Sequence, residues 1–405
     1  MEKEFIKENR HSVTLNVTAG TIDSFRETEK TTGTVRVYDK GCIGVAGCLG
    51  KPDEAALTEQ AKQALAFDIP YPCKLDGPLE RSLLREDEIL PIPTLIPTMQ
   101  RFLDRLGALC PNFIFSNKIS LSYLRREYRN SAGRRLLGSN RALNFHLAIQ
   151  SRGSGNMMDN ILLSSTHSFD EEALLSHVKN LHDAFLRPVE LAPGRYPVVF
   201  ANWEWLVHFI QHLTGTMYAS GASLFSGKLG QKLGSERLTL AADLDQSTNP
   251  AAVFFDSEGC VSPDYRPKLI DHGVLTGLFT TKKSAAQYDL PNLGIAGAAY
   301  DGVPRIDFQH LGMYLEPTAK SLEALVPGKA IYVMFADGGN ATPDGHFATP
   351  VQTAYLMEDG KLVGRLPELQ LSAHLFDLLG NYVGTVTDAL LKNDCCSAFE
   401  MDVTY

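Results

Sequence analysis

Short apolar stretches, separated by turns that contain glycine or aspartate, dominate this sequence and constrain its fold more than any other feature. Hydrophobic side chains alternate over residues 13–17 and 35–37, and a further short strand is predicted over 43–47. The second half repeats the pattern, with hairpin turns predicted at 271–273 and 358–360. Strands that follow one another in runs, with few helices between them, predict an α+β fold rather than a doubly wound parallel sheet.

The remaining elements divide the chain into two predicted domains. Asp53 is a candidate N-cap for a helix that continues to Phe67. The other predicted elements are a Pro-rich connector over 76–97, helices over 98–109, 170–186 and 373–381, a turn at 130–133, a turn at 256–259 and a last strand over 399–403. We expect an N-terminal domain over 1–190, a meander with helices, and a mostly antiparallel C-terminal β domain over 191–405.

Charge and cysteine content narrow the class of protein. The 405 residues carry a net charge of −9, and this acidic balance opposes direct contact with nucleic acid. A local basic cluster is predicted to be the solvated face of a hairpin, with phosphate binding as the less favoured alternative; it comprises Arg125, Arg126, Arg129, Arg134 and Arg135. The seven cysteines show no C-x-x-C spacing, which fits reduced thiols in a cytosolic protein. The first residues do not resemble a signal peptide, and no window of about 18 apolar residues predicts a membrane span.

The stretch PVVFANWEWLVHFIQHLTG, from Pro197 to Gly215, raises the question of a metal site. A buried strand is predicted first, and then an amphipathic helix that carries Glu204, His208 and His212 on one face. A zinc peptidase of the H-E-x-x-H type needs a glutamate as general base directly after the first histidine, and Phe209 occupies that position.

A helix would also separate these candidate ligands. Glu204 and His212 would lie about 12 Å apart along the axis, so at most one adjacent pair could share an ion. The simpler interpretation is that His208 and His212 are hydrogen-bonded or half-exposed beneath Trp203 and Trp205. We therefore assign no catalytic, cofactor-binding or metal-ligating residue.

Several longer segments resemble the TldD/PmbA family of zinc-peptidase-related proteins, also called TldD/TldE. The N-terminal SVTLNVTAGTIDSFRETEKTTGTVRVYDKGCIGVAG is similar to the opening strands of that family, and YRNSAGRRL resembles its N-S-x-G turn. Three stretches of the second half carry the rest of the resemblance: SGASLFSGKLGQKLGSERLTLAADL, FFDSEGCVSPDYRPKLIDHGVLTGLFTTKKSAAQYDLPNLGIAG and AYLMEDGKLVGRLPELQLSAHLFDLLGN.

The resemblance implies a division into two kinds of subunit. TldD-type chains hold zinc with H-E-x-x-x-H and a cysteine near the C-terminus, whereas TldE-type chains keep the fold, lack the motif and pair with a TldD-type partner. The two motif histidines fall on Leu206 and Gln211 of this chain, and the motif glutamate falls on Val207. Cys395 or Cys396 lies near the region of the family's cysteine, within a different flanking sequence. The resemblance therefore implies a TldE-like chain.

Three functions follow as alternatives. The first is a non-catalytic subunit of a cytosolic peptidase that dimerises with itself or with a TldD-type paralogue and helps to bind an extended peptide. The second is an active metallopeptidase with a displaced metal site built from His208, His212 and either Cys395 or Cys396. The third is a regulatory binding protein of the DNA gyrase modulator type.

Overall fold

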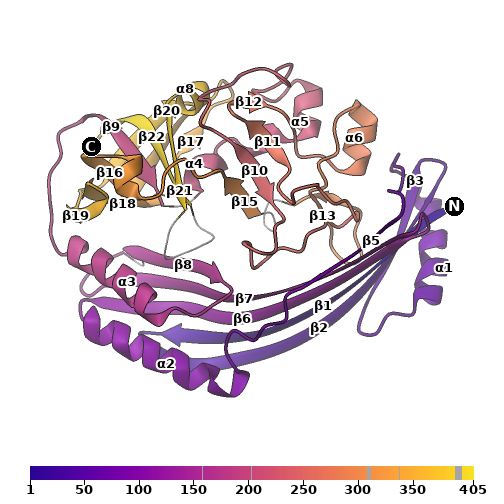
Figure 1. Cartoon of the computed structure of the whole chain (residues 1–405), viewed down its shortest axis with the longest axis horizontal. Coiled ribbons are helices and arrows are strands. Elements are labelled where there is room, and N and C mark those ends of the chain that lie inside the picture. Colours follow the sequence, from indigo (N-terminus) through magenta and orange to yellow (C-terminus); the bar gives the residue numbers. More distant parts are fainter. Residues whose placement is uncertain (157, 202, 308–311, 337, 388–394) are drawn as a thin grey trace.

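A computed structural model describes residues 1–405 except 157, 202, 308–311, 337 and 388–394. A long curved sheet from the N-terminal half cradles the C-terminal half, with α1 at one end of the sheet and α2 and α3 near the other (Figure 1). Most strands are antiparallel and the helices lie outside the sheets, so the predicted α+β class is confirmed.

The N-terminal sheet has eight strands in the order β4-β3-β2-β1-β6-β7-β5, with β8 paired to the free part of β7. Only the pairing of β5 with β7 is parallel. The strands are β1 (Glu2–Thr18), β2 (Thr21–Asp39), β3 (Cys42–Leu49), β4 (Ile69–Pro70), β5 (Leu79–Leu84), β6 (Phe113–Asn130), β7 (Arg134–Ser151) and β8 (Asn160–Thr166).

Three helices cover one face of this sheet, and the alternation in the sequence explains why. The side chains of Val13, Leu15 and Val17 point to one face of β1 and are fully buried in a core shared with α2 (Ile92–Leu109) and α3 (Glu171–Phe185). Helix α1 (Glu54–Ala64), followed by the 3₁₀ turn η1 (Leu65–Phe67), packs on β2 and β3. As predicted, the Asp53 side chain caps α1 by accepting from the backbone N–H groups of Ala55 and Ala56.

The main C-terminal sheet closes on itself. The order β16-β9-β22-β20-β18 is completed by pairing between β18 and β16, and only β9 and β16 run parallel. Strands β17, β19 and β21 extend it at the sides. Its strands are β9 (Gly194–Phe200), β16 (Lys329–Ala336), β17 (Asn340–Ala341), β18 (His346–Glu358), β19 (Lys361–Arg365), β20 (Leu369–His374), β21 (Tyr382–Thr387) and β22 (Cys395–Thr404).

Smaller elements complete the C-terminal half. A four-stranded sheet contains β10 (Leu240–Asp243), β11 (Lys268–Asp271), β12 (Val274–Leu275) and β15 (Gly312–Leu315), and β13 (Ala296–Gly297) pairs with β14 (Arg305–Ile306). The short helices are α4 (Glu204–Val207), η2 (Ile210–Leu213), α5 (Gly215–Ser220), α6 (Lys282–Tyr288), α7 (Leu322–Leu325) and α8 (Leu375–Gly380). None of the helices in the described ranges is both long and apolar enough to cross a membrane.

Several predicted elements are confirmed and others are wrong. The turns at 130–133, 271–273 and 358–360 connect β6 to β7, β11 to β12 and β18 to β19. Helix α2 begins at Ile92, earlier than predicted, because Pro91 and Pro93 lie at its first positions, where a missing N–H costs little. The connector before α2 contains β5, and the turn at 256–259 does not join two strands.

The two halves share hydrophobic packing. One core lies within the closed sheet and the short helices that cover it. The other contains side chains of β1, α2 and α3 together with Val199, Tyr332 and Tyr355 from the outer face of the closed sheet. The predicted domain boundary at 190/191 stays a prediction.

Candidate functional site

The segment after β9 is not the amphipathic helix that the sequence predicts. It forms α4, a break at His208 and Phe209, and the 3₁₀ turn η2. The break follows from packing, because Trp205, Leu206 and Phe209 are all buried in the core while Val207 is 69% exposed. The prediction that Glu204, His208 and His212 lie on one face of a single helix is therefore wrong.

Each of these three polar side chains has a different neighbour. The Glu204 carboxylate accepts a hydrogen bond from the backbone N–H of Ala336 at 3.1 Å. The His208 ring stacks on Phe347, with centroids 4.8 Å apart, and the Nδ1 atom of buried His212 accepts from the Leu224 N–H at 3.3 Å. Burial lowers the pKa of both histidines, so both rings are neutral near pH 7.

These residues do not fit a shared metal ion. Zinc needs several ligand atoms converging at about 2 Å, and Nδ1 of His212 is already an acceptor for a backbone N–H. Within the described ranges, no group of three or more His, Cys, Asp or Glu side chains could hold a metal. Cys395 and Cys396 are buried on β22, in different hydrophobic cores. The positions that the resemblance matches to the motif are buried Leu206, exposed Val207 and exposed Gln211.

A polar cleft of about 730 Å³ lies on the outer face of the closed sheet. Ala348, Ser372, Asp402 and Arg195 line it from successive positions across β18, β20, β22 and β9. Hydrogen-bonding groups therefore line a broad hollow that an extended polar chain could enter.

Two further histidines stand side by side in this cleft. His346 and His374 are directly opposed on β18 and β20, with ring centroids 4.7 Å apart. His374 Nδ1 accepts from the Phe376 N–H at the start of α8, so Nε2 carries the proton that it donates to the Asp344 carbonyl at 2.9 Å. His374 is thus a helix cap. The two histidines lie 28 positions apart in the sequence, so no local motif predicts their meeting.

The turn at 256–259 forms a buried joint between the halves of the molecule. The Asp256 carboxylate accepts from three backbone N–H groups, those of Glu258, Cys260 and Ala296. The next three residues are each bound by the N-terminal half: Arg36 donates to the Ser257 carbonyl at 2.8 Å, Tyr71 to the Glu258 carboxyl at 2.6 Å and Arg134 to the Gly259 carbonyl at 2.7 Å.

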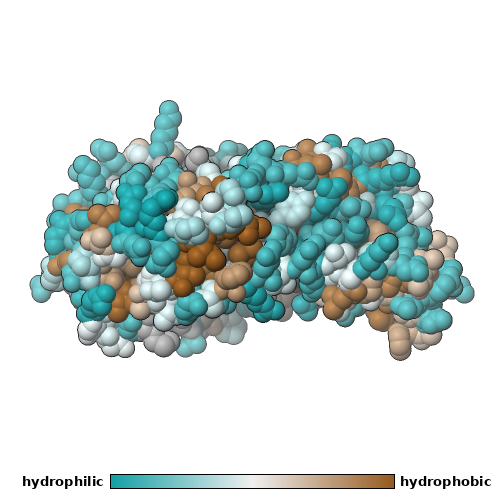
Figure 2. All heavy atoms as spheres, turned by 90° about the horizontal axis from the view of Figure 1, so that it is seen from below, coloured by the Kyte–Doolittle hydropathy of each residue, from teal (hydrophilic) through white to brown (hydrophobic). Residues whose placement is uncertain are grey.

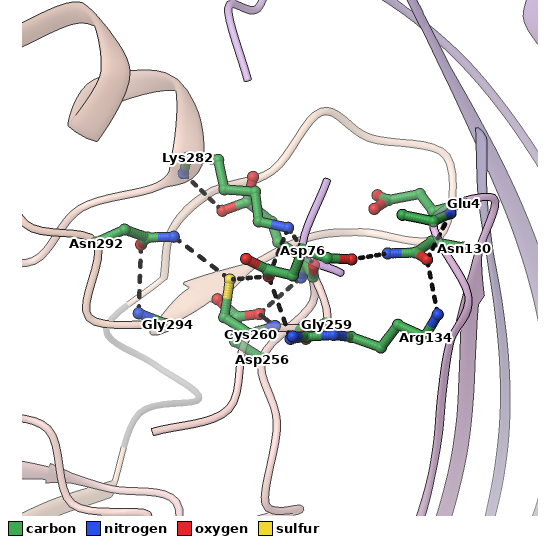
Figure 3. Close-up of polar contacts among 12 residues, drawn as sticks. Glu4, Asp76, Asn130, Arg134, Asp256, Gly259, Cys260, Lys282, Asn292 and Gly294 are labelled. Carbon is green, nitrogen blue, oxygen red and sulfur yellow. Dashed lines mark hydrogen bonds and ion pairs between the residues drawn. The ribbon is translucent and has the colours of Figure 1, made fainter. Parts of the chain in front are cut away.

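Asp76 extends the joint on one side (Figure 3). Lys282 Nζ lies 3.0 Å from its carboxylate and Arg134 lies 3.3 Å from it, and the Cys260 thiol donates to it at 3.4 Å. The Asn130 side chain, in the turn between β6 and β7, donates to the Asp76 carbonyl. Burial, with the neighbouring carboxylates, raises the pKa of Cys260 well above its usual value, so this thiol is not poised as a nucleophile.

Charges elsewhere in the joint are also deeply buried. Glu4 on β1 takes hydrogen bonds from Arg36, Tyr38 and Tyr128. Burial, with the nearby Asp256 carboxylate, raises the pKa of Glu258 to about 8.

The predicted basic cluster is largely neutralised by acidic partners: Arg125 pairs with Glu86, Arg126 with Glu8, Arg129 with Glu54 and Arg134 with Asp76.

Comparison with known proteins finds a matching family model and two related metalloproteases. A model of the PmbA/TldA metallopeptidase C-terminal domain matches residues 193–398. A metalloprotease of Methanothermobacter thermautotrophicus is 24% identical over 284 residues, covering 66% of this chain and 61% of that protein. A metalloprotease of Methanocaldococcus jannaschii is 26% identical over 186 residues, covering 45% of this chain and 38% of its own length. The matches thus span less than two thirds of both relatives.

Solved structures share the whole fold. TldE from Thermococcus kodakarensis superposes with a TM-score of 0.82 at 18% identity, over 100% of this chain and 97% of that one. A Thermotoga maritima protein described as a modulator of DNA gyrase gives 0.78 at 16% identity, over 100% and 96%. The family model covers just over half of the chain, and Arg134, directly after the N-S-A-G turn, binds the Gly259 carbonyl of the D-S-E-G turn. This chain belongs to the PmbA/TldD metallopeptidase family.

Proposed function

We propose that this chain is a TldE-type, non-catalytic subunit of a cytosolic peptidase, paired with a TldD-type subunit that supplies the metal centre and acting on unfolded peptides. One observation carries the proposal. Where the family motif would place its ligands and base, this chain has buried Leu206, exposed Val207 and Gln211, while His208 and His212 are engaged by Phe347 and by the Leu224 N–H.

The polar cleft supports the role in peptide binding. Its volume of about 730 Å³ leaves room for a main chain, and its lining carries the donors and acceptors that an extended peptide needs. Three carboxylates line the cleft, those of Asp377, Glu400 and Asp402, against one arginine, Arg195, and this balance favours peptides without a concentration of negative charge. Because no group of three or more His, Cys, Asp or Glu side chains among the described residues could hold a metal, the proposed contribution of the cleft is to hold and orient the substrate.

Two measurements test the proposal. Elemental analysis of the purified chain should find no stoichiometric zinc. Cleavage of an unstructured peptide should be absent with this chain alone and should appear when the H-E-x-x-x-H-bearing relative from the same genome is added. Metal-dependent cleavage by this chain alone, abolished by His208→Ala or His212→Ala, would overturn the proposal and favour the displaced metal site.

A further inference from the structure

One part of the N-terminal sheet has an uncovered edge. Strand β2 pairs with β1 along its length, but β3 pairs with it only from Thr32 to Asp39. The Gln100 side chain accepts from the Ile22 N–H at one end of the uncovered stretch, and Gly50 N–H donates to the Thr31 carbonyl at the other. Between these contacts, residues 23–30 have no neighbouring strand on their outer side among the described residues (Figure 1).

The backbone of this edge is arranged to accept another strand. Because the Thr31 carbonyl points outward to Gly50, the alternation of an antiparallel ladder directs the backbone groups of Phe25, Glu27 and Glu29 outward as well. These N–H and C=O groups form a row to which an incoming extended chain could bind. A hollow of about 420 Å³ lies at one end of the row, lined by Thr28, Glu29, Lys30, Thr31, Leu49 and Gly50.

Apolar side chains are exposed next to this row. Phe25 is 59% exposed and Leu49 is 60% exposed. On α2, which packs against β2, Ile92 and Ile96 are 39% and 37% exposed. Hydrophobic side chains also gather on the face of the molecule that carries α2 (Figure 2). Charged side chains alone can protect a strand edge from unwanted pairing. The exposed apolar side chains beside this edge therefore indicate a binding surface.

The two faces of the edge carry opposite charges. Phe25, Glu27 and Glu29 lie opposite Leu15, Val13 and His11, on the face that α2 covers. Arg26 and Lys30 lie on the other face, where Lys30 Nζ sits 5.4 Å from the centre of the Tyr300 ring. The helix side of the edge therefore carries two carboxylates, of which Glu27 contacts His11 Nε2 at 2.7 Å, and the other side is basic.

This pattern opposes antiparallel pairing of the edge with a second copy of the chain. Two identical antiparallel edge strands are related by a twofold axis normal to the sheet, which keeps each face on its own side. Glu27 and Glu29 would then face the same acidic stripe, and Arg26 and Lys30 the same basic stripe, in every register. Directly opposed like charges destabilise a strand pair.

We propose that residues 23–30 of β2 bind an edge strand of a different protein, which extends the eight-stranded sheet. That strand carries Lys or Arg on the face toward α2, Asp or Glu on the opposite face, and an apolar residue against Phe25. The occupant is the TldD-type subunit, so this inference rests on the proposed function and assigns the surface by which the two subunits join.

The test uses two kinds of variant of the full chain and a matched control. Glu27→Lys with Glu29→Lys reverses the acidic stripe at solvent-exposed positions. Glu27→Pro removes one outward N–H and leaves the ladder to β1 intact, because the lost donor faces away from β1. Glu236→Lys with Glu323→Lys changes the net charge equally at two exposed positions of the C-terminal half.

Affinity for the H-E-x-x-x-H-bearing relative is measured by titration calorimetry, with circular dichroism to check the folding of each variant. We expect both edge variants to weaken binding at least about tenfold and the control to match the wild type. Amide exchange at Phe25, Glu27 and Glu29 should slow on complex formation. If Glu27→Pro fails to fold, the lysine variant and the exchange data decide.

The outcomes separate this inference from the proposed function. A wild-type complex that both edge variants form with unchanged affinity would overturn the edge assignment and leave the subunit role standing. No complex with the wild-type chain would overturn the subunit role and the assignment together. A wild-type homodimer that Glu27→Pro dissolves would make a second copy the occupant of the edge and overturn its assignment to a different protein.

Discussion

The joint at residues 256–259 and the segment at 204–213 both carry side chains that the sequence marks as chemically interesting, and they differ in how those groups are used. At the joint, the groups converge from both halves of the molecule, and Ser257, Glu258 and Gly259 are each bound by the N-terminal half. In the segment, Glu204, His208 and His212 diverge toward three separate neighbours.

This difference shows which residues of the chain carry the family resemblance. Arg134, directly after the N-S-A-G turn, binds the D-S-E-G turn, so residues of the resembling segments connect the two halves of the molecule. The positions that the resemblance matches to a metal motif hold buried Leu206 and exposed Val207 and Gln211, which do not form a set of zinc ligands. Four substitutions test this contrast between convergent and divergent polar groups.

The largest effect is expected at the buried ion pair of the joint. Arg36→Met removes the cationic partner of Glu4, whose side chain is 0% exposed, and it removes the donor to the Ser257 carbonyl. We expect a loss of about 3–5 kcal/mol in the free energy of unfolding, measured by urea denaturation. Lys62→Met, which breaks an exposed pair with Glu59, is the control and should cost about 0.5 kcal/mol or less. An equal effect of the two variants would contradict the joint's role.

Gly259→Ala tests the close approach of the two halves. Gly259 has φ +70°, and an added Cβ would lie 2.2 Å from the ring of buried Tyr128. Gly221→Ala is a matched control, because its φ is +79° with no atom within 4 Å. Backbone strain of about 1 kcal/mol should appear in both variants, and crowding should add about 1–3 kcal/mol only at Gly259. Equal shifts of the urea midpoint would show that the Tyr128 contact is not restrictive.

Glu258 gives the joint a dependence on pH. Its pKa is raised from 4.5 to about 8 in the folded chain, so the folded state binds a proton more tightly than the unfolded state. The stabilisation is complete below pH 4.5 and is lost as the pH rises through about 8. Glu258→Gln should flatten the fall in stability between about pH 4.5 and pH 8, measured by thermal unfolding at each pH. An unchanged slope would assign that fall to other groups.

The smallest effect is expected in the segment. His212→Ala removes an acceptor for the Leu224 N–H and should cost about 1 kcal/mol, with zinc content unchanged by elemental analysis. Thermal melts with and without a chelator check the same point, since a bound ion would make the wild type sensitive to the chelator. Release of one zinc per chain on substitution would show that His212 is a metal ligand. It would contradict the contrast between the joint and the segment at 204–213.

Much of the fold was predictable from local pattern. The alternation over 13–17 predicts a strand with one buried face, and Asp53 predicts the start of α1, because both signals depend on neighbours only a few residues away. Turn chemistry likewise predicts the hairpins at 130–133 and 358–360. The break in the predicted helix at 208–209 was not predictable, because burial of Trp205 and Phe209 against β22 and its neighbours overrides helical periodicity there.

The sequence by itself determined the α+β class, the main turns and the absence of a regular metal-binding motif, since these depend on residue type and spacing. Tertiary structure alone decided that Glu258 meets Tyr71, that His346 meets His374 and that part of β2 remains an open edge. The physical reason is separation along the chain. Tyr71 and Glu258 lie 187 positions apart, and only the packing of the curved sheet against the C-terminal half brings their side chains within hydrogen-bonding distance.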